Sequence, residues 1–220
     1  MSEAYILEKI KDTTRNFQFG NIQVVQNREM PDHIDIFKIF KTLEQRFPQH
    51  YFSGLEGVKI DHHDEFEERN ITAVYKDGWM HISNQQDSPS GLLNDIIHEL
   101  AHHIETTHKK FIYEDHKLAK EFVDKRKMLN HELRSDGYWT DGYDFDDIEY
   151  SEQLDNFLYK RIGTRVLSAI TAGLFIRPYS VVSLREYFAT GFEAYYLGDK
   201  NRLYKISPSL YNRIEALDKL

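Results

Sequence analysis

The stretch 95–105 combines an apolar helical face with two histidines, and this combination limits the folds that the chain can adopt. It reads Asp-Ile-Ile-His-Glu-Leu-Ala-His-His-Ile-Glu. Ser88 followed by Pro89 is a typical N-cap and first-turn pair, so a helix is expected to begin there. The apolar residues at helical spacing, which predict a deeply packed helix, are Leu92, Leu93, Ile96, Ile97, Leu100, Ala101 and Ile104.

His98 and His102 border this face in the pattern His-Glu-x-x-His. Four residues of α-helix rise about 6 Å and return to nearly the same face. Two imidazoles placed in this way can share one tetrahedral ion, usually zinc. Glu99 can reach a water on that metal, which is the place of a general base in metal-assisted peptide hydrolysis. The alternative is a buried amphipathic helix whose histidines only satisfy hydrogen bonds.

The composition excludes several other classes of site. The chain has no cysteine, so disulfide scaffolds, thiolate zinc sites and cysteine nucleophiles are excluded, and a metal must be held by His, Asp or Glu. The formal net charge of −8 argues against nucleic acid and against an anionic membrane surface as partners. With 220 residues and 40% hydrophobic content, one domain with a sizeable core is expected. The sequence does not predict the oligomeric state.

The N-terminus predicts a cytoplasmic location. Residues 1–11 carry charges where a secretory signal would be apolar. The longest nearly apolar run, residues 166–176, is too short to span a bilayer. We therefore expect a protein made without the general secretory signal, with export by another route left open.

A β-α-β-β region is expected before the motif helix. Asp77-Gly78 separates two apolar runs and is a strong hairpin signal. The last strand of this order could lie along a cleft and offer backbone groups to an extended peptide. The expected strands are residues 21–26, 57–60, 71–75 and 79–83, and the expected helix is 33–47, with Ile34, Phe37, Ile39, Phe40 and Leu43 inward.

Helices are expected after the motif. Their predicted ranges are 115–133, 151–175 and 183–197, the last ended by Gly198, and Ser207-Pro208 opens a final short helix. The inward positions of the helix 151–175 are Leu154, Phe157, Leu158, Ile162, Val166 and Ile170. The acidic segment 141–155 is interpreted as a solvated loop that runs into a helix N-terminus, and the alternatives are a calcium site or an attraction for basic substrates.

A catalytic zinc needs a third protein ligand, and two residues compete for that role. His108 completes His-x-x-x-His-x-x-x-x-x-His with His98 and His102, which is the metzincin spacing. That pattern needs glycine three residues after the second histidine, and Glu105 stands there and favours continued helix. The other candidate is Glu186.

The run 185–192, Arg-Glu-Tyr-Phe-Ala-Thr-Gly-Phe, resembles the Glu-Phe-Phe-Ala-Glu-x-Phe segment of the anthrax lethal factor catalytic domain and of the Pro-Pro endopeptidases. Residues 80–103 also resemble the strand, loop and motif helix of this family, and residues 207–211 resemble its final helix. The likeness covers residues 70–109 and 178–218 well, and residues 20–60 in outline.

The resemblance implies roles for particular residues. Glu186 would be the third zinc ligand, and Tyr179, seven residues earlier, would help to stabilise the oxyanion. Thr190 departs from the pattern, because the family has a second glutamate there. If that glutamate orients a zinc-binding histidine, another carboxylate must replace it, and the candidates are Asp95, Glu105 and Glu193.

These observations together predict an α+β, zincin-like metallopeptidase domain spanning residues 1–220. Its parts would be an N-terminal lobe over 1–109 with a small mixed sheet and the motif helix, a helical insertion over 110–177, and a helical C-terminal lobe over 178–220, with the cleft between the lobes. The expected activity is zinc-dependent hydrolysis of a peptide or protein substrate, of the gluzincin type. The alternatives are a catalytically weak, zincin-fold binding or toxin-related module, and a metzincin-like peptidase that uses His108.

Overall fold

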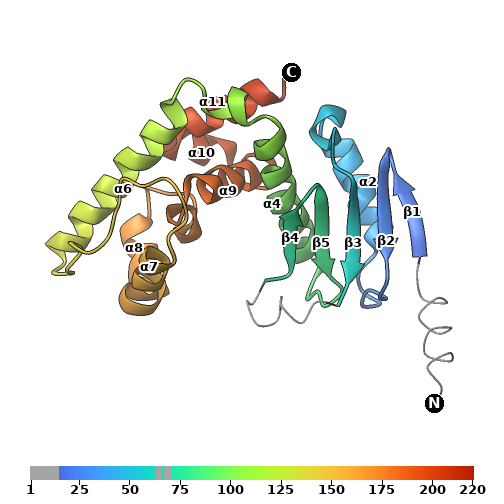
Figure 1. Ribbon diagram of the computed structural model, residues 1–220, viewed down its shortest axis with the longest axis horizontal. Helices are drawn as coiled ribbons and strands as arrows, with labels where there is room; N and C mark the ends of the chain where they lie inside the picture. The colour runs from blue at the N-terminus through green and yellow to red at the C-terminus, as the bar shows by residue number, and fades with distance from the viewer. Residues whose placement is uncertain (1–14, 63–65, 67–70) are drawn as a thin grey trace, which may run out of the picture. The chain divides into compact units, whose positions relative to one another are not determined.

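The computed structural model describes residues 15–62, 66 and 71–220, and the chain divides into two compact units, Met1–Thr107 and His108–Leu220 (Figure 1). The first unit holds a five-stranded sheet with helices, and the second is helical, so the α+β class is confirmed. The single peptidase domain in three parts stays a prediction. The expectation for residues 1–11 lies outside the described residues.

The sheet is mixed, with the order β1-β2-β3-β5-β4. β1 pairs with β2 and β4 with β5 in antiparallel fashion, whereas β3 is parallel to β2 and to β5. Asp77 and Gly78 have φ values of 51° and 83°, the positive pair that a tight hairpin turn requires, so the predicted hairpin is confirmed. The strands are β1 (Arg15–Phe19), which the sequence did not predict, β2 (Ile22–Gln26), β3 (Gly57–Asp61), β4 (Ala73–Lys76) and β5 (Trp79–Ser83).

The prediction that the last strand could lie along a cleft is wrong for β5. This strand is paired on both sides, to β3 and to β4, so its backbone groups are used within the sheet. Among the described strands, β4 stands at this edge instead. β5, the second strand of the hairpin, pairs with β3, so β4, the first strand, lies outside β5 at the edge of the sheet. The order of the strands along the chain does not show which strand of a hairpin lies outside.

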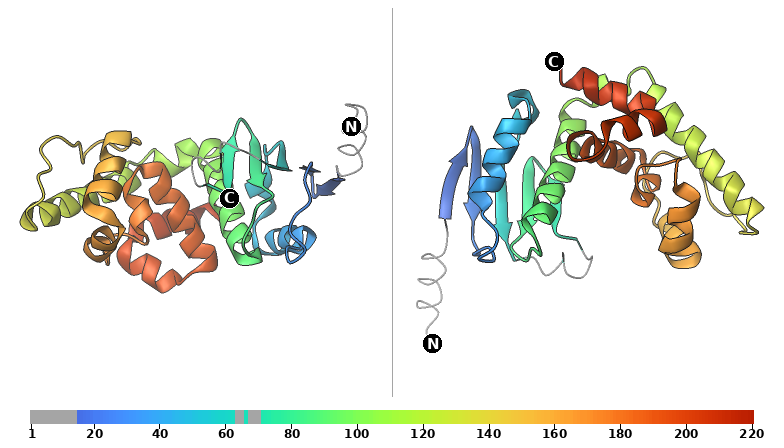
Figure 2. Two further views of the ribbon diagram at one scale, coloured as in Figure 1. Left: turned by 90° about the horizontal axis from the view of Figure 1, so that it is seen from below. Right: turned by 180° about the vertical axis from the view of Figure 1, so that it is seen from behind.

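Two helices cover one face of the sheet, α2 (Ile36–Arg46) and α4 (Pro89–Thr107) (Figures 1 and 2). Val24, Val58 and Met80 lie in register across three strands and are buried. The residues that follow them along the strands, Val25, Lys59 and His81, point to the other face and are half-buried. This alternation is typical of a sheet with one packed face.

Helix α2 begins later than the sequence predicts. Asp35 is its N-cap, and the Asp35 side chain accepts a hydrogen bond from the backbone N–H of Lys38. The buried stripe is Ile36, Ile39, Phe40 and Leu43. Phe37 was expected inward but is 57% exposed, because it lies about 100° round the helix from Ile36, at the border of the buried stripe. Its ring contacts that of Phe17 in β1, with the centroids 4.5 Å apart.

Helix α4 follows the prediction closely. The Ser88 hydroxyl accepts a hydrogen bond from the backbone N–H of Gly91 at 3.0 Å, which confirms the cap. The helix continues through Glu105 to Thr107, as expected because glutamate at position 105 favours helix where the metzincin pattern has glycine. All the predicted apolar residues are buried except Leu93, which is half-buried. A short 3-10 helix, η1 (Gln49–Phe52), packs against α4 in the same unit.

The second unit is built from helices. α9 begins after Ser183, whose side chain accepts from the backbone N–H of Glu186, and ends at Gly198, so both predicted ends are confirmed. Within residues 15–62, 66 and 71–220, no helix is both long and apolar enough to cross a membrane. The elements are α5 (Lys109–Tyr113), α6 (Lys117–Ser135), α7 (Glu152–Asn156), η2 (Phe157–Gly163), α8 (Thr164–Thr171), η3 (Pro178–Val181), α9 (Leu184–Leu197), α10 (Lys200–Ile206) and α11 (Pro208–Leu217).

The helix expected over 151–175 is interrupted by a π-helix, η2. A π turn takes up one more residue than an α turn, and the chain then leaves the helical conformation at Gly163, with φ 85° and ψ 150°, so the inward face of α8 is shifted. The residues buried after η2 are Leu167 and Thr171, in place of the predicted Val166 and Ile170, which are half-buried. The prediction was wrong there because it assumed one unbroken α-helical period.

The acidic segment 141–155 is held to α6 by a buried arginine side chain. Arg126 of α6 is fully buried and donates hydrogen bonds to the backbone carbonyls of Asp144 and Asp147. The Asp144 carboxylate accepts from two backbone N–H groups of its own loop, and Asp141 pairs with Arg134. These contacts favour the interpretation of a structural, solvated loop over a calcium site.

Candidate metal centre

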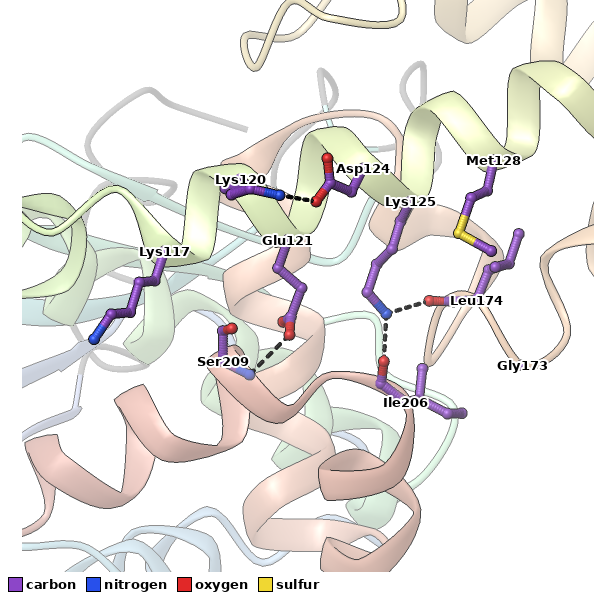
Figure 3. Close-up of a pocket in the computed structure, with 10 residues that line it drawn as sticks. All are labelled: Lys117, Lys120, Glu121, Asp124, Lys125, Met128, Gly173, Leu174, Ile206 and Ser209. Carbon is purple, nitrogen blue, oxygen red and sulfur yellow. Dashed lines mark hydrogen bonds and ion pairs between the residues drawn. The ribbon is translucent and has the colours of Figure 1, made fainter.

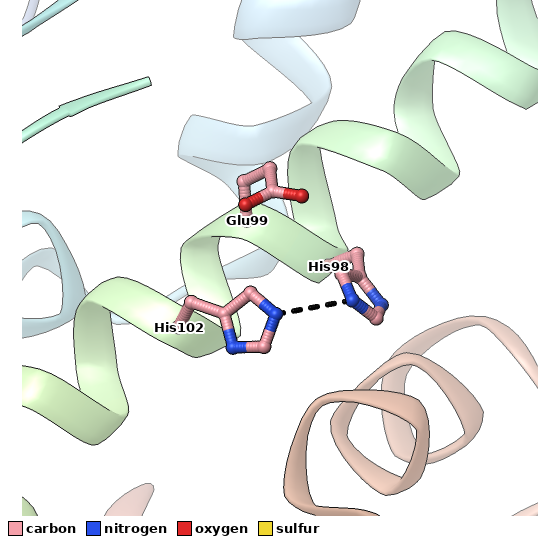
Figure 4. Close-up of side chains that lie close together, drawn as sticks. All are labelled: His98, Glu99 and His102. Carbon is pink, nitrogen blue, oxygen red and sulfur yellow. Dashed lines mark hydrogen bonds between the residues drawn. The ribbon is translucent and has the colours of Figure 1, made fainter. Parts of the chain in front are cut away.

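His98 and His102 face each other on one flank of α4 (Figure 4). Their Nε2 atoms are 3.2 Å apart, and the ring planes meet at 86°. Two nitrogens bound to a tetrahedral zinc at about 2.0–2.1 Å would be roughly 3.3 Å apart. The pair therefore has the spacing that one zinc ion requires.

Glu99 completes a compact group with the two histidines. Among the described residues, ligand atoms of His98, Glu99 and His102 all lie within 4.8 Å of one another. His98 is half-buried, and His102 and Glu99 are only 5% and 7% exposed. Two imidazole nitrogens with little solvent around them fit a zinc ion, and the Glu99 carboxylate lies beside them, where a general base would act on water.

Glu105 occupies a position that suits the support of a metal-binding histidine. Its Oε2 lies 3.9 Å from His102 Nδ1, one helical turn along α4. A carboxylate beside Nδ1 favours the proton on that nitrogen and leaves the Nε2 lone pair for a metal. Of the other carboxylates considered for this role, Asp95 accepts a hydrogen bond from the Thr72 hydroxyl, and Glu193 forms an ion pair with Arg177.

Strand β4 holds the Glu99 carboxylate. Oε2 of Glu99 accepts a hydrogen bond from the backbone N–H of Tyr75 at 2.6 Å. The backbone N–H of Ser83 donates to the carbonyl of Thr72, so these two residues form a hydrogen-bonded pair between β5 and β4. Such pairs alternate with non-hydrogen-bonded pairs along an antiparallel ladder. Tyr75, three positions further along β4, therefore belongs to a non-hydrogen-bonded pair, and its N–H points away from β5. Sequence reasoning missed this contact, because a backbone donor leaves no signal in residue type.

The third histidine of the stretch, His103, has a structural role. It is fully buried, with Nε2 3.0 Å from the carbonyl oxygen of Ser53 and Nδ1 3.2 Å from the Tyr75 hydroxyl. A proton on Nε2 lets the ring donate to Ser53 and accept from Tyr75. The interpretation of a histidine that only satisfies hydrogen bonds therefore applies to His103, which joins α4 to β4 and η1.

The two remaining predicted site residues belong to the second unit, and they are neighbours there. Glu186 lies in the first turn of α9, and Tyr179 lies in η3 and is 46% exposed. Burial, followed by the Glu186 carboxylate, raises the pKa of the Tyr179 hydroxyl, so the phenol stays protonated well above neutral pH. Tyr179 can therefore act as a hydrogen-bond donor beside Glu186.

Thr190 has a structural role in the second unit. Its hydroxyl lies 2.7 Å from the Ser180 hydroxyl and 2.7 Å from the backbone carbonyl of Glu186. The ion pair between Arg177 and Glu193, at 2.6 Å, is a second link between the same elements. Both contacts fasten the segment that carries Tyr179 to α9.

His108, the other candidate for the third ligand, lies outside the motif helix. α4 ends at Thr107, and His108 has φ −114° and ψ 21° and precedes α5. It therefore does not continue the helical face of His98 and His102. The choice between Glu186 and His108 stays a prediction.

A cavity of about 470 Å³ in the second unit has the character of a structural junction (Figure 3). The Nζ of Lys125 donates to the carbonyls of Leu174 (2.6 Å) and Ile206, and burial lowers the pKa of this amine to about 8. Glu121 accepts from the backbone N–H of Ser209 at 2.8 Å. The buried Lys125 and the half-buried Glu121 thus bind backbone groups of the protein itself, and they join α6 to α10 and α11.

Comparison of the chain with protein-family models, curated proteins and solved structures finds no match. The likeness to the lethal factor catalytic domain and the Pro-Pro endopeptidases therefore rests on the sequence segments alone.

Proposed function

We propose that the chain is a zinc-dependent endopeptidase of the gluzincin type, with a zincin-like fold. The observation that carries the proposal is the pair of Nε2 atoms of His98 and His102, 3.2 Å apart, with Glu99 on the turn between them. The sequence resemblance supplies Glu186 as the third ligand. Three protein ligands leave one position of a tetrahedral zinc for water, as in catalytic sites.

The proposed chemistry is the addition of water to a peptide carbonyl. When bound, zinc supplies Lewis acidity, which polarises the scissile carbonyl and lowers the pKa of water. Glu99 takes a proton from the attacking water and returns it to the amine nitrogen as the carbon–nitrogen bond breaks. The hydrogen bond from Tyr75 holds Glu99 for this role. The Tyr179 hydroxyl donates to the carbonyl oxygen as that oxygen becomes negative.

The edge of the sheet supports a peptide as the substrate. β4 is the edge among the described strands, and Ala73, two residues before Tyr75, directs its backbone groups to the same side. An extended peptide can add to such an edge through main-chain hydrogen bonds. Because Tyr75 also binds Glu99, a peptide on β4 would lie beside the proposed general base.

A second candidate function is a zincin-fold binding or toxin-related module with little turnover. Thr190 favours it, because this hydroxyl, unlike the family's glutamate, is committed to Ser180 and to the backbone of Glu186. The carboxylate of Glu105 beside His102 speaks against it, since it offers a replacement for the missing support.

Metal analysis combined with hydrolysis of a mixed peptide library tests the proposal. The expected result is stoichiometric zinc and cleavage that a chelator abolishes and added zinc restores. Bound zinc without cleavage would favour the binding module. Protein that takes up no zinc after dialysis against the ion would overturn the metal centre itself. Glu99→Gln, prepared in the same way, controls for contaminating peptidases.

A further inference from the structure

Tyr159 lies beside Tyr179 and Glu186, the predicted site residues of the second unit, although the segments that resemble the peptidase family do not include it. It belongs to the π-helix η2, and its ring centroid is 6.5 Å from that of Tyr179, with the planes at 53°. The carboxylates of Asp155 and Glu186 both raise the pKa values of these two phenols, in addition to the effect of burial. Four side chains from four different elements therefore gather in one place.

The Tyr159 hydroxyl is buried and has no hydrogen-bond partner within the described part of the chain. Other tyrosines of this unit donate to carboxylates, Tyr187 to Glu121 at 2.9 Å and Tyr150 to Asp155 at 3.2 Å. A buried hydroxyl without an acceptor is unfavourable, and native proteins keep few of them. A phenol is protonated at neutral pH, so the Tyr159 hydroxyl can donate a hydrogen bond to an acceptor that comes within reach.

Glu186 is the acceptor that the surroundings favour. Of the two carboxylates that act on Tyr159, Asp155 already accepts from Tyr150, whereas Glu186 is the proposed zinc ligand. A carboxylate that binds a metal through one oxygen is oriented by a donor to the other oxygen. Thr190 does not supply this donor, because its hydroxyl binds the backbone carbonyl of Glu186.

We propose that Tyr159 is a positioning residue, whose hydroxyl donates to the Glu186 carboxylate when zinc is bound and holds that carboxylate in the orientation that binds zinc. The inference rests on the proposed role of Glu186 as the third ligand. It assigns a function to the π-helix, because the extra residue per turn sets the direction in which Tyr159 points.

Zinc affinity, measured by competition with a chromophoric chelator, tests this inference without any substrate. Tyr159→Phe should weaken zinc binding about tenfold or more, as expected for loss of a partner of a metal ligand. Tyr179→Phe removes the same atom from the neighbouring ring and should change the affinity by less than about twofold. The thermal midpoint of Tyr159→Phe, measured without zinc, should equal or exceed that of the zinc-free wild type, because before zinc binds the hydroxyl has no partner within the described part of the chain.

A second comparison separates positioning from general packing. In a Glu186→Ala background, Tyr159→Phe should have no further effect on zinc affinity, because the carboxylate it supports is absent. Unchanged affinity of the single variant, or an equal loss in both backgrounds, would overturn the inference. Wild-type protein that binds zinc and shows the Tyr159 effect but cleaves no peptide would overturn only the peptidase proposal. Wild-type protein that binds no zinc would overturn both.

Discussion

Ser180 Oγ and Thr190 Oγ1 lie 2.7 Å apart, and both residues are buried. The backbone N–H of Arg177 donates to the Ser180 hydroxyl, and the Thr190 hydroxyl donates to the carbonyl of Glu186. A continuous chain of hydrogen bonds thus runs from η3 to the first turn of α9. It joins the segment that carries Tyr179 to the turn that carries Glu186.

Thr190→Val should therefore weaken the fold. Valine keeps the shape of threonine but leaves the buried Ser180 hydroxyl without its partner, which costs about 1–3 kcal/mol in the free energy of unfolding. Urea denaturation measures the change. Thr42→Val is the matched control, because Thr42 also donates to the carbonyl four residues earlier but lies at the surface. Equal stability of wild type and Thr190→Val would contradict a structural role for this contact.

Glu99→Gln should abolish hydrolysis while zinc stays bound. Glutamine can still accept the hydrogen bond from Tyr75 through its amide oxygen, so the local fold is kept. It cannot take a proton from water, and the expected loss in kcat is roughly 10²-fold or more. Turnover of a fluorogenic peptide and zinc content are measured on the same preparation. Near-normal turnover by the zinc-loaded variant would remove Glu99 from the role of base.

Zinc content after dialysis separates the two candidates for the third ligand. Glu186→Ala should lose zinc or bind it much more weakly, because two protein ligands do not make a catalytic site. His108→Ala should retain it, since His108 lies beyond the end of α4 and outside the helical face of the two histidines. The reverse pattern would favour the metzincin-like interpretation.

The free energy of unfolding should fall as the pH rises above about 10. Burial, followed by the Glu121 carboxylate, raises the pKa of the Tyr187 hydroxyl well above its ordinary value of 10.0. The unfolded chain releases this proton near pH 10 while the native state keeps it, so stability that is present below pH 10 is lost above it.

Tyr187→Phe removes that titration and should reduce the slope of unfolding free energy against pH. It should also lower the stability at neutral pH, because the hydrogen bond to Glu121 is lost. Urea denaturation between about pH 8 and pH 11 measures both effects. Tyr204→Phe is the control, since Tyr204 is 53% exposed. A slope that is the same in Tyr187→Phe and in the wild type would show that another group causes the alkaline loss.

Local chemistry explains the parts of the fold that the sequence predicted well. Both ends of α9 follow from residues beside them in the chain, the Ser183 cap and Gly198. The β4–β5 hairpin follows from Asp77-Gly78, whose backbone needs positive φ. The pair His98 and His102 was likewise predictable, because four residues of helix fix their spacing.

The rest depends on contacts between residues far apart in sequence. The position of β4 at the sheet edge is decided by which strand pairs with β3, and strand patterns alone do not show this. The π-helix and the break at Gly163, after which Leu167 is buried in place of Val166, do not follow from the hydrophobic pattern of the segment. The contact of Tyr75 with Glu99 uses a backbone N–H, which every residue except proline has.

Tyr179→Phe tests the mechanism beyond metal binding. The phenol takes no ligand position in the proposed centre, so zinc content, fold and substrate affinity should be kept. The variant loses one hydrogen bond that strengthens as the carbonyl oxygen becomes negative, and such a bond acts on the transition state more than on the ground state. Removing one oxyanion donor costs about 2.7–4 kcal/mol, which is roughly 10²–10³ in kcat.

Steady-state kinetics on one cleavable peptide decides between this role and packing of the ring. The substitution removes only the hydroxyl, so the contact of the Tyr179 ring with Tyr159 survives it. If Tyr179 is only a packed aromatic, kcat should hardly change, and Tyr204→Phe gives the background for loss of an exposed hydroxyl. A raised KM with unchanged kcat would make Tyr179 a substrate-binding residue. A large fall in kcat with zinc retained is the result we expect, because a phenol is protonated at neutral pH and can donate to the developing oxyanion.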